Sequence, residues 1–262
     1  MFLQGNVYSE LLSMHTGLNV LVPEKTRNGG PCRIVYLLHG LHGNSDTWLA
    51  NTMLPVYAKE YDALFIMPEV GRSFYTDMKH GLAYFTYVRD ELPEICGRIF
   101  NISGEPGDTA VIGCSMGAYG ALRCALTKPE QYGFCGAISG ACFFMNENLD
   151  ELRQDSGRWL KKGGPHAGEV LRDFYAIFGD DLRYGPEEMI FTLIQQAAAA
   201  PRKPKLYAAC GEGDGFYQEN LRFWSEIRQF DIDFTFEHWP GVHDWYFFND
   251  ALKKTLDQWL GK

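Results

Sequence analysis

The chain has 262 residues, of which 46% are hydrophobic and 15% aromatic, so it is expected to fold as one large globular domain with a sizeable core. Its formal net charge is -9, and its strongest basic run, Arg158–Lys162, is short, which argues against a nucleic-acid partner. No apolar run approaches the roughly 20 residues of a membrane span, and the first residues lack the basic and apolar regions of a secretory signal.

The seven cysteines occur at irregular spacing, and neither a C-x-x-C nor an H-E-x-x-H pattern is present. An odd number of scattered cysteines is typical of core thiols rather than of a disulfide framework, so a cytoplasmic location is expected. His39 and His42 lie three residues apart in a glycine-rich loop without a third ligand nearby, which is more typical of structural histidines. We therefore expect no metal and no cofactor.

The first third of the chain opens with two strand-like pieces, Val7–Ser13 and Leu18–Val22, which predict an antiparallel hairpin. A turn is expected at Arg27–Pro31. Cys32–Leu38 is an almost continuous apolar run, the pattern of a strand buried on both faces. It leads into the glycine-rich segment His39–Asn44.

The next elements are a helix near Met53–Tyr61 and a second buried strand, Ala63–Met67. Gly71–Lys79 has the composition of a loop. A long helix is predicted over Leu82–Arg98, although Pro93 makes its middle uncertain.

The middle of the chain contains a strand–turn–helix unit around a G-x-S-x-G motif. The strand Thr109–Ile112 ends at Gly113, Ser115 occupies the turn, and Gly117 precedes a helix over Ala118–Thr127. A serine at such a sharp corner is exposed to a neighbouring base, and the flanking glycines let the strand and the helix pack closely around it. The helix N-terminus also presents N–H groups to a developing oxyanion. Ser115 is therefore the candidate nucleophile.

Strands and helices continue to alternate after this unit, apart from an insertion rich in charges, glycines and large apolar side chains at about 141–200. The elements expected around the insertion are, in order, a strand at Gly136–Ser139, a strand at Lys205–Cys210, a helix at Gln218–Phe230, a strand at Asp233–His238 and a helix at Trp245–Leu260. This alternation predicts an α/β fold with a mostly parallel twisted sheet and helices on both faces. We expect one domain, 1–262, with a lid-like helical insertion over the carboxyl edge of the sheet, where sites in such sheets lie.

A nucleophilic serine needs a histidine base and a carboxylate that orients it, and in this fold the chain order is serine, acid, histidine. Of the histidines after Ser115, only His243 lies in a loop between the last strand and the last helix. The acid should follow an earlier strand, and Asp214 lies in a glycine-flanked loop after Lys205–Cys210, with Glu212 as a local rival.

The oxyanion produced by attack needs two N–H donors. One is expected from Met116, the residue after the serine, and the other from the loop after the third strand. Gly40 and Gly43 allow that loop to turn its amides inward, and Leu41 is the expected donor.

These stretches resemble the esterase D family of α/β-hydrolases, which includes tributyrin esterases, feruloyl or cinnamoyl esterases and S-formylglutathione hydrolases. The matching segments are Leu38–Asn44 with Trp48, Gly113–Leu122, Cys210–Asp214 and Gly241–Trp245. The resemblance implies the α/β-hydrolase fold and the same roles for Ser115, Asp214, His243, Leu41 and Met116. Ala118 departs from the pattern, because many relatives have glycine there, and only local packing is expected to change.

The expected reaction is hydrolysis of a small-molecule ester through an acyl-enzyme. Short-chain acyl esters are the first choice; feruloyl, cinnamoyl or acetyl-xylan esters and the thioester of S-formylglutathione are alternatives. Trp159 or Phe144 is expected to wall an acyl pocket, and Trp48 is expected to contact substrate, although aromatic residues of an insertion often only pack it onto the sheet. An acyltransferase, a non-enzymatic scaffold and a homo-oligomer remain open alternatives.

Overall fold

The computed structural model describes residues 1–23, 30–162 and 164–261. Residues 27–29 of the expected turn at Arg27–Pro31 lie outside these described residues. The strands are β1 (Phe2–Ser9), β2 (Met14–Leu21), β3 (Arg33–Leu38), β4 (Ala63–Pro68), β5 (Thr109–Cys114), β6 (Phe134–Ile138), β7 (Lys205–Gly211) and β8 (Phe234–Trp239). The α-helices are α1 (Thr47–Asn51), α2 (Leu54–Tyr57), α3 (Tyr84–Thr86), α4 (Leu92–Ile99), α5 (Met116–Thr127), α6 (Met145–Gln154), α7 (Ser156–Lys162), α8 (Ala167–Phe178), α9 (Ile190–Ala199), α10 (Tyr217–Ile227) and α11 (Trp245–Leu260).

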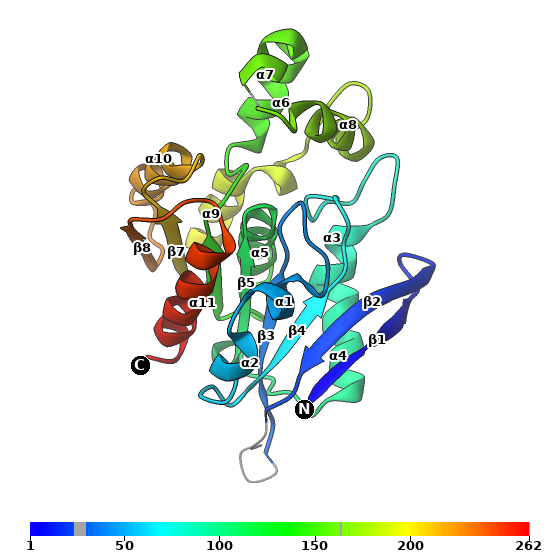
Figure 1. Cartoon of the computed structure of the whole chain (residues 1–262), viewed down its shortest axis with the longest axis vertical. Coiled ribbons are helices and arrows are strands. Elements are labelled where there is room, and N and C mark those ends of the chain that lie inside the picture. Colours follow the sequence, from blue (N-terminus) through cyan, green and yellow to red (C-terminus); the bar gives the residue numbers. More distant parts are fainter. Residues whose placement is uncertain (24–29, 163, 262) are drawn as a thin grey trace.

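All eight strands form one twisted sheet in the order β1-β2-β4-β3-β5-β6-β7-β8 (Figure 1). β1 and β2 pair antiparallel with each other, β2 pairs antiparallel with β4, and every pair from β4 to β8 is parallel. The expected mostly parallel α/β sheet is therefore confirmed. Because the carboxyl ends of parallel strands share one edge, the loops after β3, β5 and β7 meet there.

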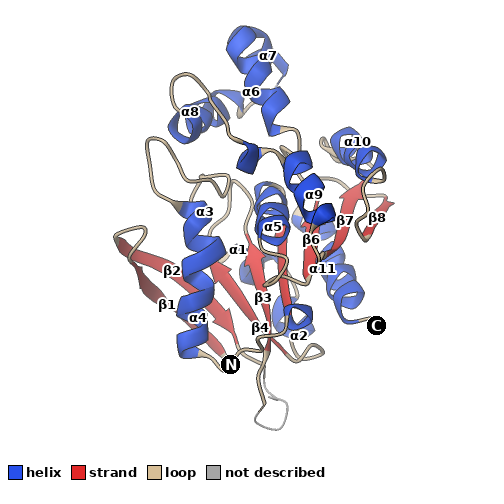
Figure 2. Cartoon of the chain, turned by 180° about the vertical axis from the view of Figure 1, so that it is seen from behind, coloured by secondary structure: helices blue, strands red, loops and turns tan. Residues whose placement is uncertain are grey.

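Helices cover both faces of the sheet, as the alternating pattern predicts. Figure 2 shows α4, α5 and α9 in front of the sheet, whereas α1, α2 and α11 lie on the opposite face in Figure 1. Successive residues of β3 point to opposite faces, so Ile34, Tyr36 and Leu38 join one hydrophobic cluster and Val35 and Leu37 join the other. This double burial explains why the strand has an unbroken apolar sequence.

The entry hairpin is formed, but its first strand starts earlier than predicted. β1 covers Phe2–Ser9 instead of Val7–Ser13, and the register pairs Ser9 with Met14 around a short turn. β1 is the exposed edge strand, so its residues carry no buried-versus-exposed alternation from which its start could be located.

The predicted long helix over Leu82–Arg98 is divided into three pieces. A short α3 passes into a π-turn at Tyr87–Glu91, and the N–H of Leu92 closes that wide turn on the carbonyl of Tyr87. Pro93 then lies in the first turn of α4, where its missing N–H costs no intrahelical hydrogen bond. The proline therefore determines where the regular helix restarts.

The chain between β6 and β7 is helical, and it contains α6 to α9. α9 packs against α5, and α6, α7 and α8 stand beyond the carboxyl ends of the strands (Figure 1). Among the described residues, no helix combines the length and the apolar character that crossing a bilayer requires.

Candidate active site

The turn between β5 and α5 has the strained geometry that the G-x-S-x-G motif predicts. Ser115 has φ 54° and ψ -120°, a left-handed conformation that costs free energy and persists only where packing enforces it. A Cβ atom on Gly113 would lie 2.1 Å from the carbonyl oxygen of Gly117, and one on Gly117 would lie 2.3 Å from the carbonyl oxygen of Leu38. Both glycines are therefore required by close backbone contacts around the serine.

Three side chains from three loops meet at this turn. His243, between β8 and α11, places Nε2 3.0 Å from Ser115 Oγ and Nδ1 2.8 Å from Asp214 Oδ2. Asp214, in the loop after β7, has a fully buried side chain, and the N–H of Phe216 donates to its Oδ1 at 2.8 Å. With Nδ1–H donating to the carboxylate, Nε2 is left as the acceptor for the serine hydroxyl.

The carboxylate of Asp214 is stabilised by this network. Burial by itself raises the pKa of a carboxyl group, but the hydrogen bonds from His243 and from the N–H of Phe216 outweigh it. The pKa of Asp214 consequently lies below its usual value, so the group is an anion near neutral pH.

Glu212, the local rival for the acid, lies beside a different histidine. Its Oε1 is 3.0 Å from Nδ1 of His238, and both side chains are partly exposed. His166, in the chain between β6 and β7, contacts the ring of His42 and lies 3.4 Å from Glu169. The structure therefore brings only His243 to the serine.

The loop after β3 passes directly over the serine. A Cβ atom on Gly40 would lie 3.4 Å from Ser115 Cβ. The loop is held by its carbonyl groups: Trp48 Nε1–H donates to Leu38 O at 3.1 Å, and the Tyr75 hydroxyl donates to His39 O at 2.9 Å. These bonds fix the backbone on which Leu41 stands.

Leu41 and Met116 both line the cavity beside Ser115. Within the described parts of the chain, no group accepts a hydrogen bond from either of their backbone N–H groups. The N–H of Met116 is also the first of α5, where the helix offers it no acceptor. Two free donors next to the serine are what stabilisation of an oxyanion needs.

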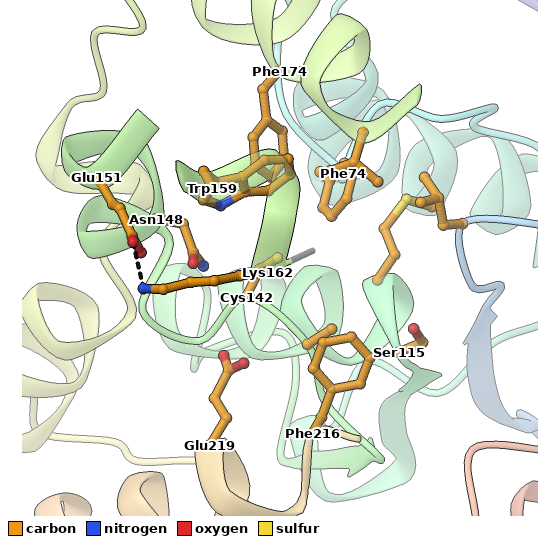
Figure 3. A pocket seen from close by; sticks show the side chains of 14 residues that line it. Phe74, Ser115, Cys142, Asn148, Glu151, Trp159, Lys162, Phe174, Phe216 and Glu219 are labelled. Carbon is orange, nitrogen blue, oxygen red and sulfur yellow. Dashed lines mark hydrogen bonds and ion pairs between the residues drawn. The ribbon is translucent and has the colours of Figure 1, made fainter. Parts of the chain in front are cut away.

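A cavity of about 300 Å³ opens beside Ser115 and extends beneath the helices of the β6–β7 connection (Figure 3). Phe74, from the loop after β4, packs against Phe174 of α8 with ring centroids 5.1 Å apart, and Trp159 of α7 lies 6.1 Å from Phe174. These three rings form an aromatic wall. The remaining lining residues are Leu41, Met116, Ala141, Cys142, Asn148, Glu151, Lys162, Val170, Phe216 and Glu219.

Of the three aromatic residues predicted to contact substrate, only Trp159 lines this cavity. Trp48 requires a correction: its side chain is fully buried in the core, where its ring packs edge-on against Trp245 at 5.3 Å. Phe144 is also corrected, because it is buried outside the cavity between Phe191 and the guanidinium of Arg222. Both rings contribute to packing. The presence of an aromatic residue in a motif or an insertion does not show by itself whether its ring packs in the core or lines the cavity.

Several lining residues were not predicted from the sequence as site residues, among them Phe74, Phe216 and Glu219. Phe216 follows the acid by two residues, and its ring packs against the His243 ring at 5.1 Å. Phe74 follows the carboxyl end of β4, a position that can suggest a site in such sheets. Glu219 carries no sequence signal, because a carboxylate in an amphipathic helix is normally solvated.

In the described ranges, no group of three or more His, Cys, Asp or Glu side chains is arranged to hold a metal ion. The groups that the described residues bring together at the site are a hydroxyl, an imidazole and a carboxylate.

Comparison with known proteins shows the family to which the chain belongs. The Esterase family, described as "Putative esterase", matches residues 9–258. The acetyl esterase of Caldicellulosiruptor saccharolyticus is 27% identical over 271 residues, which cover 99% of this chain and 98% of that protein. An S-formylglutathione hydrolase of Bos taurus is 27% identical over 146 residues, or 47% of this chain and 51% of that protein.

Two solved structures from Staphylococcus aureus superpose over almost the whole chain. Fluorophosphonate-binding serine hydrolase F gives a TM-score of 0.84 at 28% identity and covers 100% of this chain and 99% of its own. An S-formylglutathione hydrolase gives a TM-score of 0.81 at 27% identity, and the match covers 99% of this chain and 98% of that protein. A ferulic acid esterase, with a TM-score of 0.77, 18% identity and coverage of 99% and 97%, shares the fold. Given a family match that spans nearly the full length, this chain belongs to the Esterase family and is a carboxylic ester hydrolase of the esterase D type with the α/β-hydrolase fold.

Proposed function

We propose that the protein is a serine carboxylesterase that hydrolyses short-chain acyl esters through an acyl-enzyme, with Ser115 as nucleophile. The proposal rests on one observation above all: His243 bridges the Ser115 hydroxyl and the Asp214 carboxylate with contacts of 3.0 and 2.8 Å. This is the hydrogen-bonded geometry that lets an imidazole remove the serine proton during attack.

In the first half-reaction, Ser115 Oγ attacks the ester carbonyl while His243 Nε2 takes its proton. The negative charge on the carbonyl oxygen is stabilised by the N–H groups of Leu41 and Met116. His243 then gives the proton to the leaving alcohol, and Asp214 stabilises the imidazolium in the interval. In the second half-reaction, water attacks the acyl-enzyme by the same route in reverse and restores the serine.

The size of the cavity favours a small acyl group. A volume of about 300 Å³ lies at the lower end of the range found for ligand pockets. The acetyl esterase relative supports the same choice, because it matches this chain along its whole length.

Hydroxycinnamate esters are a second candidate, favoured by the aromatic wall of Phe74, Trp159 and Phe174, which can pack against a planar acyl group. Thioester hydrolysis of S-formylglutathione is a third candidate, supported by relatives with that name. Rates measured on butyrate, ferulate and formyl-thioester substrates separate the three.

The direct test replaces the nucleophile. Ser115→Ala is expected to lower kcat for p-nitrophenyl butyrate by a factor of roughly 10⁴ or more, and to abolish labelling by a fluorophosphonate probe. Ser225→Ala, at an exposed position of α10, is the matched control and is expected to retain both properties. Hydrolysis near the wild-type rate in folded Ser115→Ala would rule out this mechanism.

A further inference from the structure

The cavity beside Ser115 has a polar side as well as an aromatic one. Four of its lining residues carry hydrogen-bonding or charged side chains: Asn148, Glu151, Lys162 and Glu219. In Figure 3 these four side chains lie together, and the Phe216 ring lies between Glu219 and Ser115. An acyl group attached to the serine therefore meets apolar surface first and polar groups at its far end.

Two of these polar residues neutralise each other. Lys162 Nζ forms an ion pair with Glu151, which connects α7 to α6 across the cavity (Figure 3). Asn148 is neutral. The remaining charge-bearing group on this side is the carboxyl of Glu219.

The Glu219 carboxyl is fixed in position but forms no ion pair among the described residues. Its Oε1 accepts the N–H of Phe143 at 2.6 Å, just before the start of α6. The nearest guanidinium, that of Arg222, instead binds Glu147 through two contacts of 2.6 and 2.7 Å and Glu226 through one of 2.7 Å. Within the described residues, no side-chain cation reaches ion-pair distance of Glu219.

Such a carboxyl is an acceptor that substrate can use. In its ionised form it accepts hydrogen bonds through both oxygens, and in its neutral form it still has accepting capacity. A hydroxyl group supplied by the acyl chain matches the ionised carboxyl, which has no proton to donate, whereas an ether oxygen or a second carboxylate does not.

We propose that Glu219 is a specificity-determining residue that accepts a hydrogen bond from a hydroxyl group at the far end of the substrate's acyl group. The substrate class is thereby narrowed to esters of hydroxylated acids, whether aliphatic or phenolic. This inference rests on the proposed function, because it concerns the acyl group transferred to Ser115.

The experiment compares methyl esters that differ only at the far end. The aliphatic sets are hexanoate, 6-hydroxyhexanoate and 6-methoxyhexanoate, together with the corresponding eight-carbon compounds. The aromatic set is cinnamate, 4-hydroxycinnamate and 4-methoxycinnamate. Three sets are used so that the reach from Ser115 to Glu219 is not assumed. In at least one set measured at pH 8, above the Glu219 pKa of about 7, wild-type kcat/KM is expected to favour the hydroxyl compound over the methoxy compound about tenfold or more. This is the value of a hydrogen bond to a charged acceptor.

Two variants of Glu219 and one control variant test whether this carboxyl causes the preference for the hydroxyl compound over the methoxy compound. Glu219→Met, which has no comparable acceptor, is expected to lose it, and Glu219→Gln, which keeps the bond to the N–H of Phe143, is expected to reduce it severalfold. Glu94→Gln, at an exposed position of α4 outside this cavity, is expected to retain it. Turnover of p-nitrophenyl acetate is expected to change little in the Glu94→Gln control, and in the Glu219 variants it serves as the reference rate to which each hydroxyl-to-methoxy comparison is related.

The proposal is overturned if no set shows a preference for the hydroxyl compound. It is also overturned if the preference survives in Glu219→Met, or in Glu219→Gln should the methionine variant fail to fold. A Glu94→Gln variant that loses the preference equally would overturn it as well. Hydrolysis of acetate and butyrate esters that depends on Ser115 would then still stand. If no ester is hydrolysed at all, the proposed function and this inference fail together.

Discussion

Asp214 illustrates how a single residue is selected by its surroundings. Its side chain is fully buried and receives hydrogen bonds from His243 and from the N–H of Phe216, whereas Glu212, two residues earlier, lies at the surface beside His238. Both carboxylates occur in the same glycine-rich loop of the sequence. Only the one that is directed inward can hold the imidazole and stabilise its charged form.

This difference leads to a prediction about the acid. Asp214→Asn is expected to lower kcat for p-nitrophenyl butyrate by about 10⁴-fold, because an amide can donate to Nδ1 and so favour the wrong tautomer of His243. Glu212→Gln is the matched control and is expected to stay within a few fold of wild type. Steady-state kinetics checks both, with circular dichroism to verify folding. Equal losses in the two variants would contradict the assignment.

At the scale of elements, the strand–turn–helix unit depends on backbone contacts that leave no space for a side chain. Gly117 lies at the start of α5, directly against the carbonyl of Leu38 at the end of β3. Gly97, in α4, has no atom within 4 Å of the position of a Cβ and is exposed. A side chain at position 117 would therefore clash with the backbone, whereas one at position 97 would meet no other atom.

The prediction follows from that contrast. Gly117→Ala is expected to destabilise the fold by at least about 2 kcal/mol and to abolish activity, since the new methyl group must push β3 away from α5. Gly97→Ala is expected to stabilise it by about 0.5–1 kcal/mol, because alanine loses less conformational freedom in a helix. Urea unfolding followed by fluorescence measures both, and a stabilising Gly117→Ala would show that the contact is not as tight as the structure has it.

The connection between β6 and β7 supplies both lining and packing aromatic residues. Trp159 belongs to α7, a helix without buried residues, and lines the cavity; Phe144 precedes α6 and is buried away from it. The lining role of Trp159 and the packing role of Phe144 should therefore separate specificity from stability.

Trp159→Ala is expected to lower kcat/KM for butyrate roughly tenfold relative to acetate, because contacts with the longer acyl chain are lost, while leaving the free energy of unfolding nearly unchanged. Phe144→Ala is expected to do the reverse: it should cost about 3–5 kcal/mol of stability and leave the butyrate-to-acetate ratio as in wild type. Acyl-chain series of kcat/KM, combined with urea unfolding, test the pair. A ratio that changes only in Phe144→Ala would reverse the two roles.

At the scale of the whole molecule, stability depends on pH through two half-buried carboxyl groups that act in opposite directions. For Glu69, burial raises the pKa, but the nearby His39 ring, 3.6 Å away, and hydrogen bonds from the N–H groups of Gly71 and Ser45 outweigh it, so its pKa falls to about 2. For Glu219, burial dominates and raises the pKa to about 7. The ordinary value for both groups is 4.5.

The signs follow from proton linkage. The contribution of Glu69 is fully present above pH 4.5 and is lost as the pH falls from 4.5 towards 2, whereas Glu219 makes the fold less stable as the pH rises from 4.5 to 7. Glu219→Gln is therefore expected to gain stability relative to wild type between pH 4.5 and pH 7, and Glu69→Gln to lose its deficit relative to wild type towards pH 2. Urea unfolding at several pH values checks both differences, and a Glu219→Gln difference that is flat across this range would contradict the burial of that carboxyl.

The sequence by itself determined the features that depend on local chemistry. Apolar runs such as Cys32–Leu38 predicted the buried parallel strands, and the glycines around Ser115 predicted a turn that no other residues allow. The order of Ser115, Asp214 and His243 along the alternating elements predicted that they meet at one edge of the sheet. These signals can be read from the chain because each depends on neighbours within a few residues or on the regular alternation of strands and helices.

Only the tertiary structure decided the features that depend on which surfaces meet. Trp48 and Phe144 are as aromatic as Trp159, yet only Trp159 faces the cavity, and nothing in the local sequence of Glu219 shows that the loop before α6 covers it. The start of the edge strand β1 was likewise decided by its pairing with β2. The physical reason is the same in these cases. Whether a side chain is buried, and whether it packs in the core or lines a cavity, depends on contacts between elements that are distant in the chain, and the local sequence of one element does not contain that information.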